Sequence, residues 1–185
     1  MRILGIDPGI RNTGWGVVTG DGSRLVHLAN GVIQPDPKSC DSDRLAEIAA
    51  GLASVIEAHQ PDSAAIEEIF VARSAASALK LGMARGVAMM QCASAGLEVT
   101  EIAAKQVKKS VVGTGNADKG QVAAMVTRLL SVKAVNADAA DALAIAIAAL
   151  HGGQQATDMG AEDNGLSRAI AAALARDAGS RGGAS

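Results

Sequence analysis

The sequence predicts an α/β protein in which a five-stranded mixed sheet is flanked by helices. Stretches with the length and character of strands occur at residues 3–6, 14–18, 24–33, 64–66 and 97–102. The first three stretches are separated only by turns, whereas helical segments separate the third from the fourth and the fourth from the fifth. Further helical segments follow, and the chain contains no internal repeat. This order indicates one mixed sheet with helices on its faces.

The first strand ends in an acidic residue. The apolar run 3–6 is followed at once by Asp7 and Pro8, and a proline cannot donate to a sheet ladder. We therefore expect Asp7 near the carboxyl end of a buried strand, where an ionised carboxylate is costly unless donors or a cation meet it. Asp7 either caps the following turn or is a metal ligand with partners elsewhere. A polar turn, 11–13, leads into the second strand, 14–18, as in a hairpin.

The third strand, 24–33, precedes a loop that contains two prolines. Ser42 or Asp43 is predicted to cap a helix after this loop. Its apolar residues recur at helical spacing from Leu45 to Ile56, and a Pro-Asp pair closes it.

The fourth strand is short and also ends in acidic residues. Residues 64–66 show no alternation of polar and apolar side chains, which predicts burial on both faces. The strand runs directly into Glu67 and Glu68. Two buried strands therefore end in carboxylates.

A long helix over 74–94 has an unusual face of small and apolar residues, which includes Gly82 and Gly86. Each glycine in a helix interior is less stable than alanine by roughly 1 kcal/mol. Such a face suits the close approach of another helix, a second subunit or DNA. The fifth strand, 97–102, follows after Gly96.

The remaining helices are shorter. We predict a short helix over 103–112, an amphipathic helix over 118–130 and an alanine-rich last helix over 138–150. From Gly152 onward the composition shifts to Gly, Ala, Asp and Ser. The prediction is one domain over residues 1–151 and a flexible tail over 152–185.

Composition places the chain among reduced, cytoplasmic proteins. It has 185 residues, enough for a core that needs no disulfides, and its two cysteines lie far apart. The sequence starts without the basic and apolar regions of a signal peptide, and no apolar run approaches membrane-spanning length, so we expect no membrane partner. Aromatic residues are nearly absent, so Ala, Val, Ile, Leu and Met must build the core.

The charge distribution is more informative than the net charge of −2. Residues 72–130 carry a net charge of +5, and the rest of the chain carries −7. A basic segment in an acidic protein is a candidate surface for a polyanion such as nucleic acid, although solvated helix faces produce the same bias. The basic residues of the segment are Arg73, Lys80, Arg85, Lys105, Lys108, Lys109, Lys119 and Arg128.

The acidic residues predict the chemistry. Asp138 and Asp141 lie three residues apart at the start of the last helix, so both carboxylates project from one face. Alone, such a pair usually caps the helix and complements its dipole. The rest of this helix is apolar and must pack on the sheet, which brings its first turn to the edge where Asp7 and Glu67 emerge. Four converging carboxylates repel one another unless a hard cation such as Mg²⁺ or Mn²⁺ binds them, and two such ions suit phosphodiester hydrolysis.

Four motifs in this order resemble the RuvC family of bacterial Holliday-junction resolvases. They are GIDPG at 5–9, AIEEIF at 65–70, KQVKKSVVGTGNADKGQV at 105–122 and DAADALAIAI at 138–147. The resemblance covers about residues 1–150. It implies the RNase-H-like fold, a homodimer and an endonuclease with up to two Mg²⁺ ions per subunit, for which Mn²⁺ can substitute. It also implies paired, symmetric nicks in opposing strands of a four-way DNA junction, and a RuvA–RuvB branch-migration motor as a partner.

The resemblance also implies roles for individual residues. The catalytic, metal-binding acids are Asp7, Glu67, Asp138 and Asp141, with Glu68 an ordinary polar neighbour. Lys108 and Lys119 are the DNA-facing lysines near the active site, where a lysine stabilises charge in the transition state. Phe70 matches an aromatic at the unpaired bases of the junction, although a lone phenylalanine after a strand is more often a core residue. The other predicted DNA contacts are Arg73, Lys80, Arg85, Lys105 and Lys109.

Three alternatives differ in class. A related RNase-H-like nuclease that processes ribosomal RNA shares an early Asp-x-Gly motif and later acids. A sugar-kinase or actin-like ATPase needs two such domains and a second phosphate loop, for which this chain is too short; the segment around Gly113 is not a P-loop either. A non-catalytic junction-binding module would not need all four acids. A comparison of structured RNA with junction DNA as the substrate would distinguish the first alternative from a resolvase.

Overall fold

The computed structural model describes residues 1–20, 24–68, 74–132 and 135–162 of the chain. Its contacts divide the chain into two units, Met1–His151 and Gly152–Ser185. The sheet lies in the first unit, and the predicted role of residues 152–185 as a flexible tail stays a prediction.

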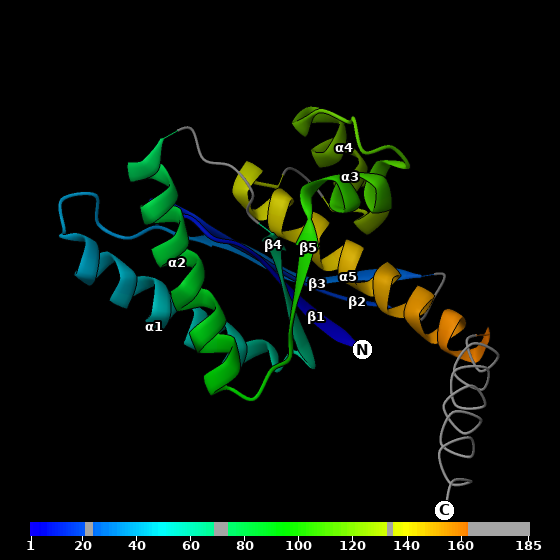
Figure 1. The fold of residues 1–185 in the computed structure, drawn as a ribbon, viewed down its shortest axis with the longest axis horizontal. Coiled ribbons are helices and arrows are strands. Elements are labelled where there is room, and N and C mark those ends of the chain that lie inside the picture. Colours follow the sequence, from blue (N-terminus) through cyan, green and yellow to red (C-terminus); the bar gives the residue numbers. More distant parts are fainter. Residues whose placement is uncertain (21–23, 69–73, 133–134, 163–185) are drawn as a thin grey trace, which may run out of the picture. The chain divides into compact units, whose positions relative to one another are not determined.

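One five-stranded sheet forms the centre of the first unit (Figure 1). Its spatial order is β3-β2-β1-β4-β5. The antiparallel pairs are β1 with β2 and β2 with β3, and the parallel pairs are β1 with β4 and β4 with β5, which confirms the predicted mixed sheet. The strands are β1 (Arg2–Asp7), β2 (Thr13–Gly20), β3 (Leu25–Ile33), β4 (Ser63–Glu68) and β5 (Val99–Ala103).

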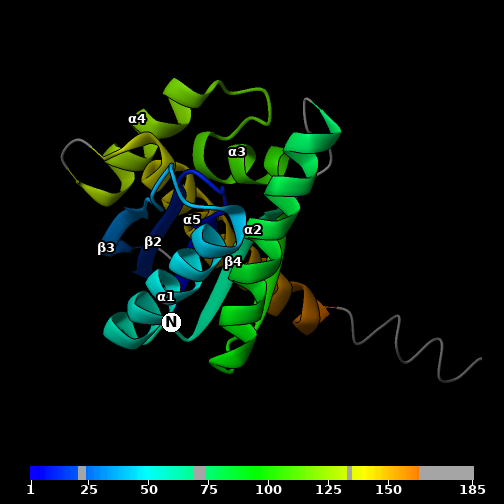
Figure 2. The same ribbon diagram turned by 90° about the vertical axis from the view of Figure 1, so that its left-hand side faces the viewer.

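Helices cover both faces of the sheet, as Figure 2 shows from the side. The helices are α1 (Asp41–His59), α2 (Ala75–Ser94), α3 (Ala104–Val112), α4 (Lys119–Leu130) and α5 (Ala137–Glu162). One aliphatic core lies between the sheet and α1 and α2, and the other lies between the sheet and α3, α4 and α5. The buried residues of the two cores are Ala, Val, Ile and Leu together with Cys92, largely as predicted, whereas the methionines expected in the core lie only at its margin, with Trp15.

Glycines allow α5 to lie directly on the backbone of the sheet. A Cβ on Gly5 of β1 would overlap the carbonyl oxygen of Ala142, and a Cβ on Gly14 of β2 would overlap that of Asp138. A Cβ on Gly16 would likewise press into the Leu143 side chain. The small side chains of α5 and these three glycines together bring the helix main chain against β1 and β2. We call this contact the glycine seam.

Two predicted helix ends differ from the structure. The N-cap of α1 is Cys40, so Ser42 and Asp43 lie inside the first turn instead of capping it. The acidic residues Asp41 and Asp43 still stabilise this helix end through the dipole. The last helix continues past Leu150 to Glu162, because two glycines after His151 weaken a helix without removing its hydrogen bonds, as a proline would.

Side chains cap the starts of two further helices. Ser74 caps α2, and its hydroxyl accepts from the Ser77 amide. Asp118 and Gln121 form a capping box at the start of α4.

Cys92 packs in the core, where burial raises the pKa of its thiol to about 11. Within the described ranges, no helix has both the length and the hydrophobicity that crossing a bilayer demands.

Candidate active site

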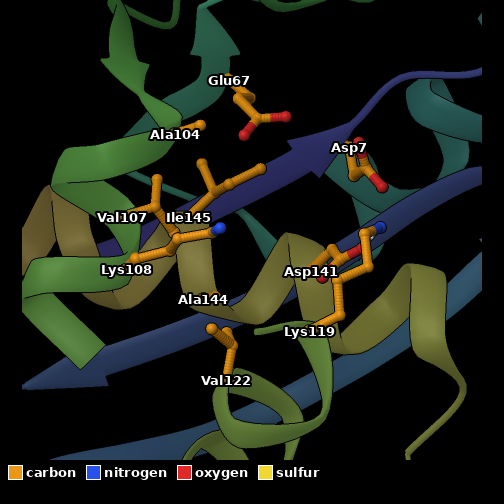
Figure 3. Close-up of a pocket in the computed structure, with 10 residues that line it drawn as sticks. All are labelled: Asp7, Glu67, Ala104, Val107, Lys108, Lys119, Val122, Asp141, Ala144 and Ile145. Carbon is orange, nitrogen blue, oxygen red and sulfur yellow. Dashed lines mark hydrogen bonds and ion pairs between the residues drawn. The ribbon is translucent and has the colours of Figure 1, made fainter. Parts of the chain in front are cut away.

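Carboxylates from three elements meet in one pocket (Figure 3). Asp7 ends β1, Glu67 lies near the end of β4, and Asp141 comes from the first turns of α5. The pocket has a volume of about 100 Å³, which is well below the roughly 300 Å³ at which sites for organic ligands begin. Its size therefore suits ions, water and a phosphate group rather than an organic cofactor.

The topology of the sheet places Asp7 beside Glu67. The parallel strands β1 and β4 are paired up to Ile6 and Ile66, and each acid is the next residue of its strand. Since both strands run in the same direction, their acidic ends emerge at the same edge. The prediction that two buried strands end in neighbouring carboxylates agrees with this register.

The glycine seam places Asp141 near these two acids. The close contact at Gly5 and Gly14 fixes the start of α5 on the ends of β1 and β2. Asp141 then faces the pocket, while the residues that follow, such as Leu143 and Ile147, are buried in the core.

Asp7 lies in an unfavourable environment for a charge. Burial is the main cause that raises its pKa to about 7, and the carboxylates of Asp141 and Glu67 add to the shift. Lys119 opposes it. Near neutral pH the Asp7 carboxyl group is therefore present in both protonation states.

Glu67 is affected in the same direction. Burial raises its pKa, the Asp141 carboxylate adds to the rise, and Lys119 and Lys108 oppose it. The two carboxylates at the sheet edge thus share an excess of negative charge that the lysines compensate only in part.

Two lysines complete the pocket. Lys108 comes from α3 and Lys119 from the first turn of α4, and Figure 3 shows their amino groups directed toward the carboxylates. Nζ of Lys119 lies 2.7 Å from Oδ2 of Asp141. The hydrogen bond to Asp141 raises the pKa of Lys119, so this side chain stays protonated through the physiological range.

Asp138 lies at the edge of the site. It contributes to the charge around Asp7 but does not line the pocket. Its Oδ2 accepts a hydrogen bond from Nδ2 of Asn12 at 3.0 Å. The structure therefore brings three of the four predicted acids into one pocket, with the fourth beside it.

The remaining predicted DNA contacts have varied surroundings. Lys80 forms an ion pair with Asp41 at 3.3 Å. Arg85 forms an ion pair with Glu101. Lys105 and Lys109 lie on α3, next to Lys108. Phe70 and Arg73 lie outside the described residues.

The donor set of the pocket suits a hard divalent cation. All its acids offer carboxylate oxygens, the ligands that Mg²⁺ and Mn²⁺ prefer. The raised pKa values of Asp7 and Glu67 mark negative charge that a cation would stabilise. Among the described residues, no three His, Cys, Asp or Glu side chains are already grouped closely enough to hold a metal ion.

Sequence reasoning did not identify every residue of the site. The apolar wall of the pocket is formed by Ala104, Val107, Val122, Ala144 and Ile145. Asn12, which contacts Asp138, was predicted only as part of a polar turn. Its place in the turn after the Asp7 strand is a hint, but the contact joins residues 126 positions apart and depends on the packing of α5.

Comparisons with known proteins agree with this geometry. The family model of the crossover junction endodeoxyribonuclease RuvC matches residues 3–149. The chain is 56% identical over 160 residues to the RuvC protein of Maricaulis maris, which covers 86% of this chain and 96% of that protein. It is 54% identical over 147 residues to the RuvC protein of Caulobacter vibrioides, covering 79% of this chain and 87% of that one.

Solved structures show the same fold. The structure of T. thermophilus RuvC in complex with a Holliday junction substrate is 35% identical, with a TM-score of 0.76, and covers 80% of this chain and 92% of that one. The yeast mitochondrial Holliday junction resolvase Ydc2 is 17% identical with a TM-score of 0.58 over 79% of this chain and 76% of that one, which is a likeness of fold alone.

Proposed function

The chain belongs to the RuvC family of crossover junction endodeoxyribonucleases, and from this premise we propose that it resolves Holliday junctions by hydrolysis at the acidic pocket. The observation that carries the proposal is the meeting of Asp7, Glu67 and Asp141 with Lys108 and Lys119 in one small pocket. The RNase-H-like fold with its mixed sheet is the scaffold that brings them together.

The acids and the lysines have separate tasks. Asp7, Glu67, Asp138 and Asp141 would hold Mg²⁺, or Mn²⁺ in its place, with up to two ions per subunit. Such ions supply a nucleophilic water at neutral pH and stabilise the leaving oxygen of a phosphodiester. Lys119 and Lys108 would hold the scissile phosphate and stabilise the negative charge that develops on it.

Basic residues next to the pocket support a DNA-binding role. Lys105, Lys108 and Lys109 follow one another on α3, and Lys119 begins α4. Lysines in such a group suit contacts with the phosphate backbone, which position DNA without reading its sequence. Phe70 and Arg73 are proposed from the family resemblance alone, and so is cooperation with a RuvA–RuvB motor.

An exposed face of α2 supports the proposal of a homodimer. Leu79 is 66% exposed and Met90 is 54% exposed. Gly86 lies between them on the same stripe of the helix. Among the described residues, no atom lies within 4 Å of the position that a Cβ on Gly86 would occupy. Apolar side chains around a bare glycine suit the close approach of a second helix. Two subunits would present two sites to a junction of near two-fold symmetry and so make paired nicks.

Cysteine chemistry is consistent with a cytoplasmic enzyme. Cys40 and Cys92 are both free, as we expect of a protein that works in a reducing compartment. We therefore place the activity in the bacterial cytoplasm, beside the chromosome on which recombination and repair take place.

The test uses a synthetic four-way junction and a linear duplex of the same sequence, each with and without Mg²⁺. We expect paired nicks at symmetric positions, only in the junction and only with metal. The matched control is Asp7→Asn, which keeps the shape of the side chain but removes its charge. Junction binding without nicks would point to a non-catalytic module, and cleavage of structured RNA with the junction intact would point to the ribosomal-RNA nuclease. Either result would overturn the proposal.

A further inference from the structure

The side chain of Asn12 joins three segments that are distant in sequence. Its Nδ2 donates to Oδ2 of Asp138 at 3.0 Å, and its Oδ1 accepts from Nε2 of Gln34 at 3.3 Å. Asn12 lies in the turn between β1 and β2, Gln34 directly follows β3, and Asp138 is in the first turn of α5. A single amide group thus connects the end of β3 to a carboxylate beside the acidic pocket.

The main chain of Asp138 is already fixed by other contacts. Its backbone N–H donates to Oδ1 of Asn136 at 2.9 Å. Its carbonyl oxygen lies directly over Gly14 in the glycine seam. The remaining freedom of Asp138 is rotation of its side chain, and the hydrogen bond from Asn12 restricts that rotation.

An amide suits this task better than a lysine or an arginine. It donates a hydrogen bond to the carboxylate and carries no net charge, so it orients the group without neutralising it. The full negative charge of Asp138 stays available to a cation. By contrast, Lys119 forms an ion pair with Asp141 and compensates the charge of that carboxylate.

We propose that Asn12 is a positioning residue that orients the Asp138 carboxylate for metal binding, and that Gln34 in turn orients Asn12. Outer groups that orient metal-binding carboxylates typically change metal affinity 10- to 100-fold when they are removed. The inference rests on the proposed function, because it assigns Asp138 to a metal. It adds two residues to the site that line no part of the pocket.

The test is a titration of the purified protein with Mn²⁺, with bound metal measured by electron paramagnetic resonance. Asn12→Leu keeps the approximate volume of the side chain and removes both hydrogen bonds. We expect the Mn²⁺ concentration at half saturation to rise on the order of tenfold. Gln34→Leu should shift it in the same direction by less. The melting temperature and metal-free junction binding should stay unchanged. Asn30→Leu is the matched control because its amide contacts His27 instead of Asp138.

A second background tests whether Asn12 acts through Asp138. In Asp138→Ala protein, Asn12→Leu should cause no further change in Mn²⁺ binding. An equal shift in both backgrounds, or no shift in the wild-type background, would overturn the inference. Failure of the proposed function would look different, because the unmodified protein would then leave the junction uncut in the presence of metal.

Discussion

Nζ of Lys119 lies 2.7 Å from Oδ2 of Asp141, and this ion pair links the start of α4 to the start of α5. The Lys119 side chain is 85% exposed, whereas that of Asp141 is 26% exposed. An ion pair with one such exposed partner contributes at most about 1 kcal/mol to the free energy of unfolding. Lys119 can therefore exchange the carboxylate for a DNA phosphate with little loss of stability, which suits a residue that acts on the substrate.

Replacing Lys119 should affect cleavage much more than folding. We expect Lys119→Met to lower the single-turnover cleavage rate about 10²- to 10³-fold, the usual loss when one charge-stabilising group is removed. The free energy of unfolding should change by less than about 1 kcal/mol. Rapid-quench cleavage of a labelled junction measures the first effect, and urea unfolding measures the second. Lys38→Met, at an exposed lysine outside the pocket, is the control and should cleave normally.

Asp7→Asn should separate catalysis from stability. An amide oxygen carries no charge and binds a hard cation much more weakly than a carboxylate, so cleavage should be lost while junction binding is kept. The same change removes a charge that the fold disfavours, so the metal-free variant should melt at a higher temperature than the natural protein at pH 8. Calorimetry and a gel-shift assay test both parts. Near-normal cleavage by this variant would show that Asp7 is not a metal ligand.

Stability of the metal-free protein should depend on pH in a defined direction. The pKa of Asp7 is raised from 3.8 to about 7, so between these values the folded state binds more protons than the unfolded state. The free energy of unfolding should therefore fall as the pH rises from about 4 to about 7. Glu67 shifts in the same direction and adds to the effect. Denaturant unfolding in EDTA measures the slope, which Asp7→Asn should reduce, whereas an unchanged slope would contradict the assignment.

Added Mg²⁺ should reverse this loss of stability. A cation that binds the folded state alone stabilises it by RT ln(1 + [Mg²⁺]/Kd), so above Kd the melting temperature should rise with the logarithm of the Mg²⁺ concentration. Because it favours the ionised carboxylates, its effect should be larger at pH 8 than at pH 5. Thermal unfolding over a series of Mg²⁺ concentrations tests this. Equal shifts for the natural protein and Asp7→Asn would indicate binding somewhere other than the pocket.

The glycine seam gives a prediction about geometry. Gly14→Ala adds a methyl group where the carbonyl oxygen of Asp138 lies, so the start of α5 must move away from β2. We expect a loss of stability of about 1–3 kcal/mol and a loss of cleavage larger than this destabilisation explains. Gly51→Ala is the matched control, because its methyl group would press on the Ile33 side chain, outside the pocket. That variant should cleave normally at temperatures where it is folded.

The proposed dimer face can be tested without changing the site. Leu79→Glu combined with Met90→Glu places charges on the exposed stripe of α2. We expect sedimentation to show a monomer that still binds Mn²⁺ but makes single instead of paired nicks. A variant that remains a dimer would move the interface to another face.

The parts of the site that depend on local pattern could be predicted from the sequence. Asp7 and Glu67 lie at or near the ends of buried apolar strands, and two such strands in parallel bring their ends together. The contact between Asn12 and Asp138 could not be predicted, because it depends on how α5 docks on the hairpin. Counting charges along the sequence predicted Arg85 as a DNA contact. It could not show that Arg85 forms an ion pair with Glu101, because that pair depends on the fold. The prediction that Ser42 or Asp43 caps α1 was wrong. The N-cap is Cys40, whose backbone is extended but whose side chain makes no capping hydrogen bond, so its residue type gave no signal in the sequence.

The glycine seam also bears on how this protein can change over evolutionary time. Asp138 and Asp141, two of the proposed catalytic acids, are carried by a helix whose main chain lies directly against Gly5 and Gly14 of the sheet. Exchanges among Val, Ile and Leu in the two cores can therefore alter stability while α5 keeps its place on the sheet. The proposed site should therefore tolerate many such exchanges in the interior. The vulnerability is concentrated instead in Gly5, Gly14 and Gly16, where even one added carbon displaces the helix that bears the acids.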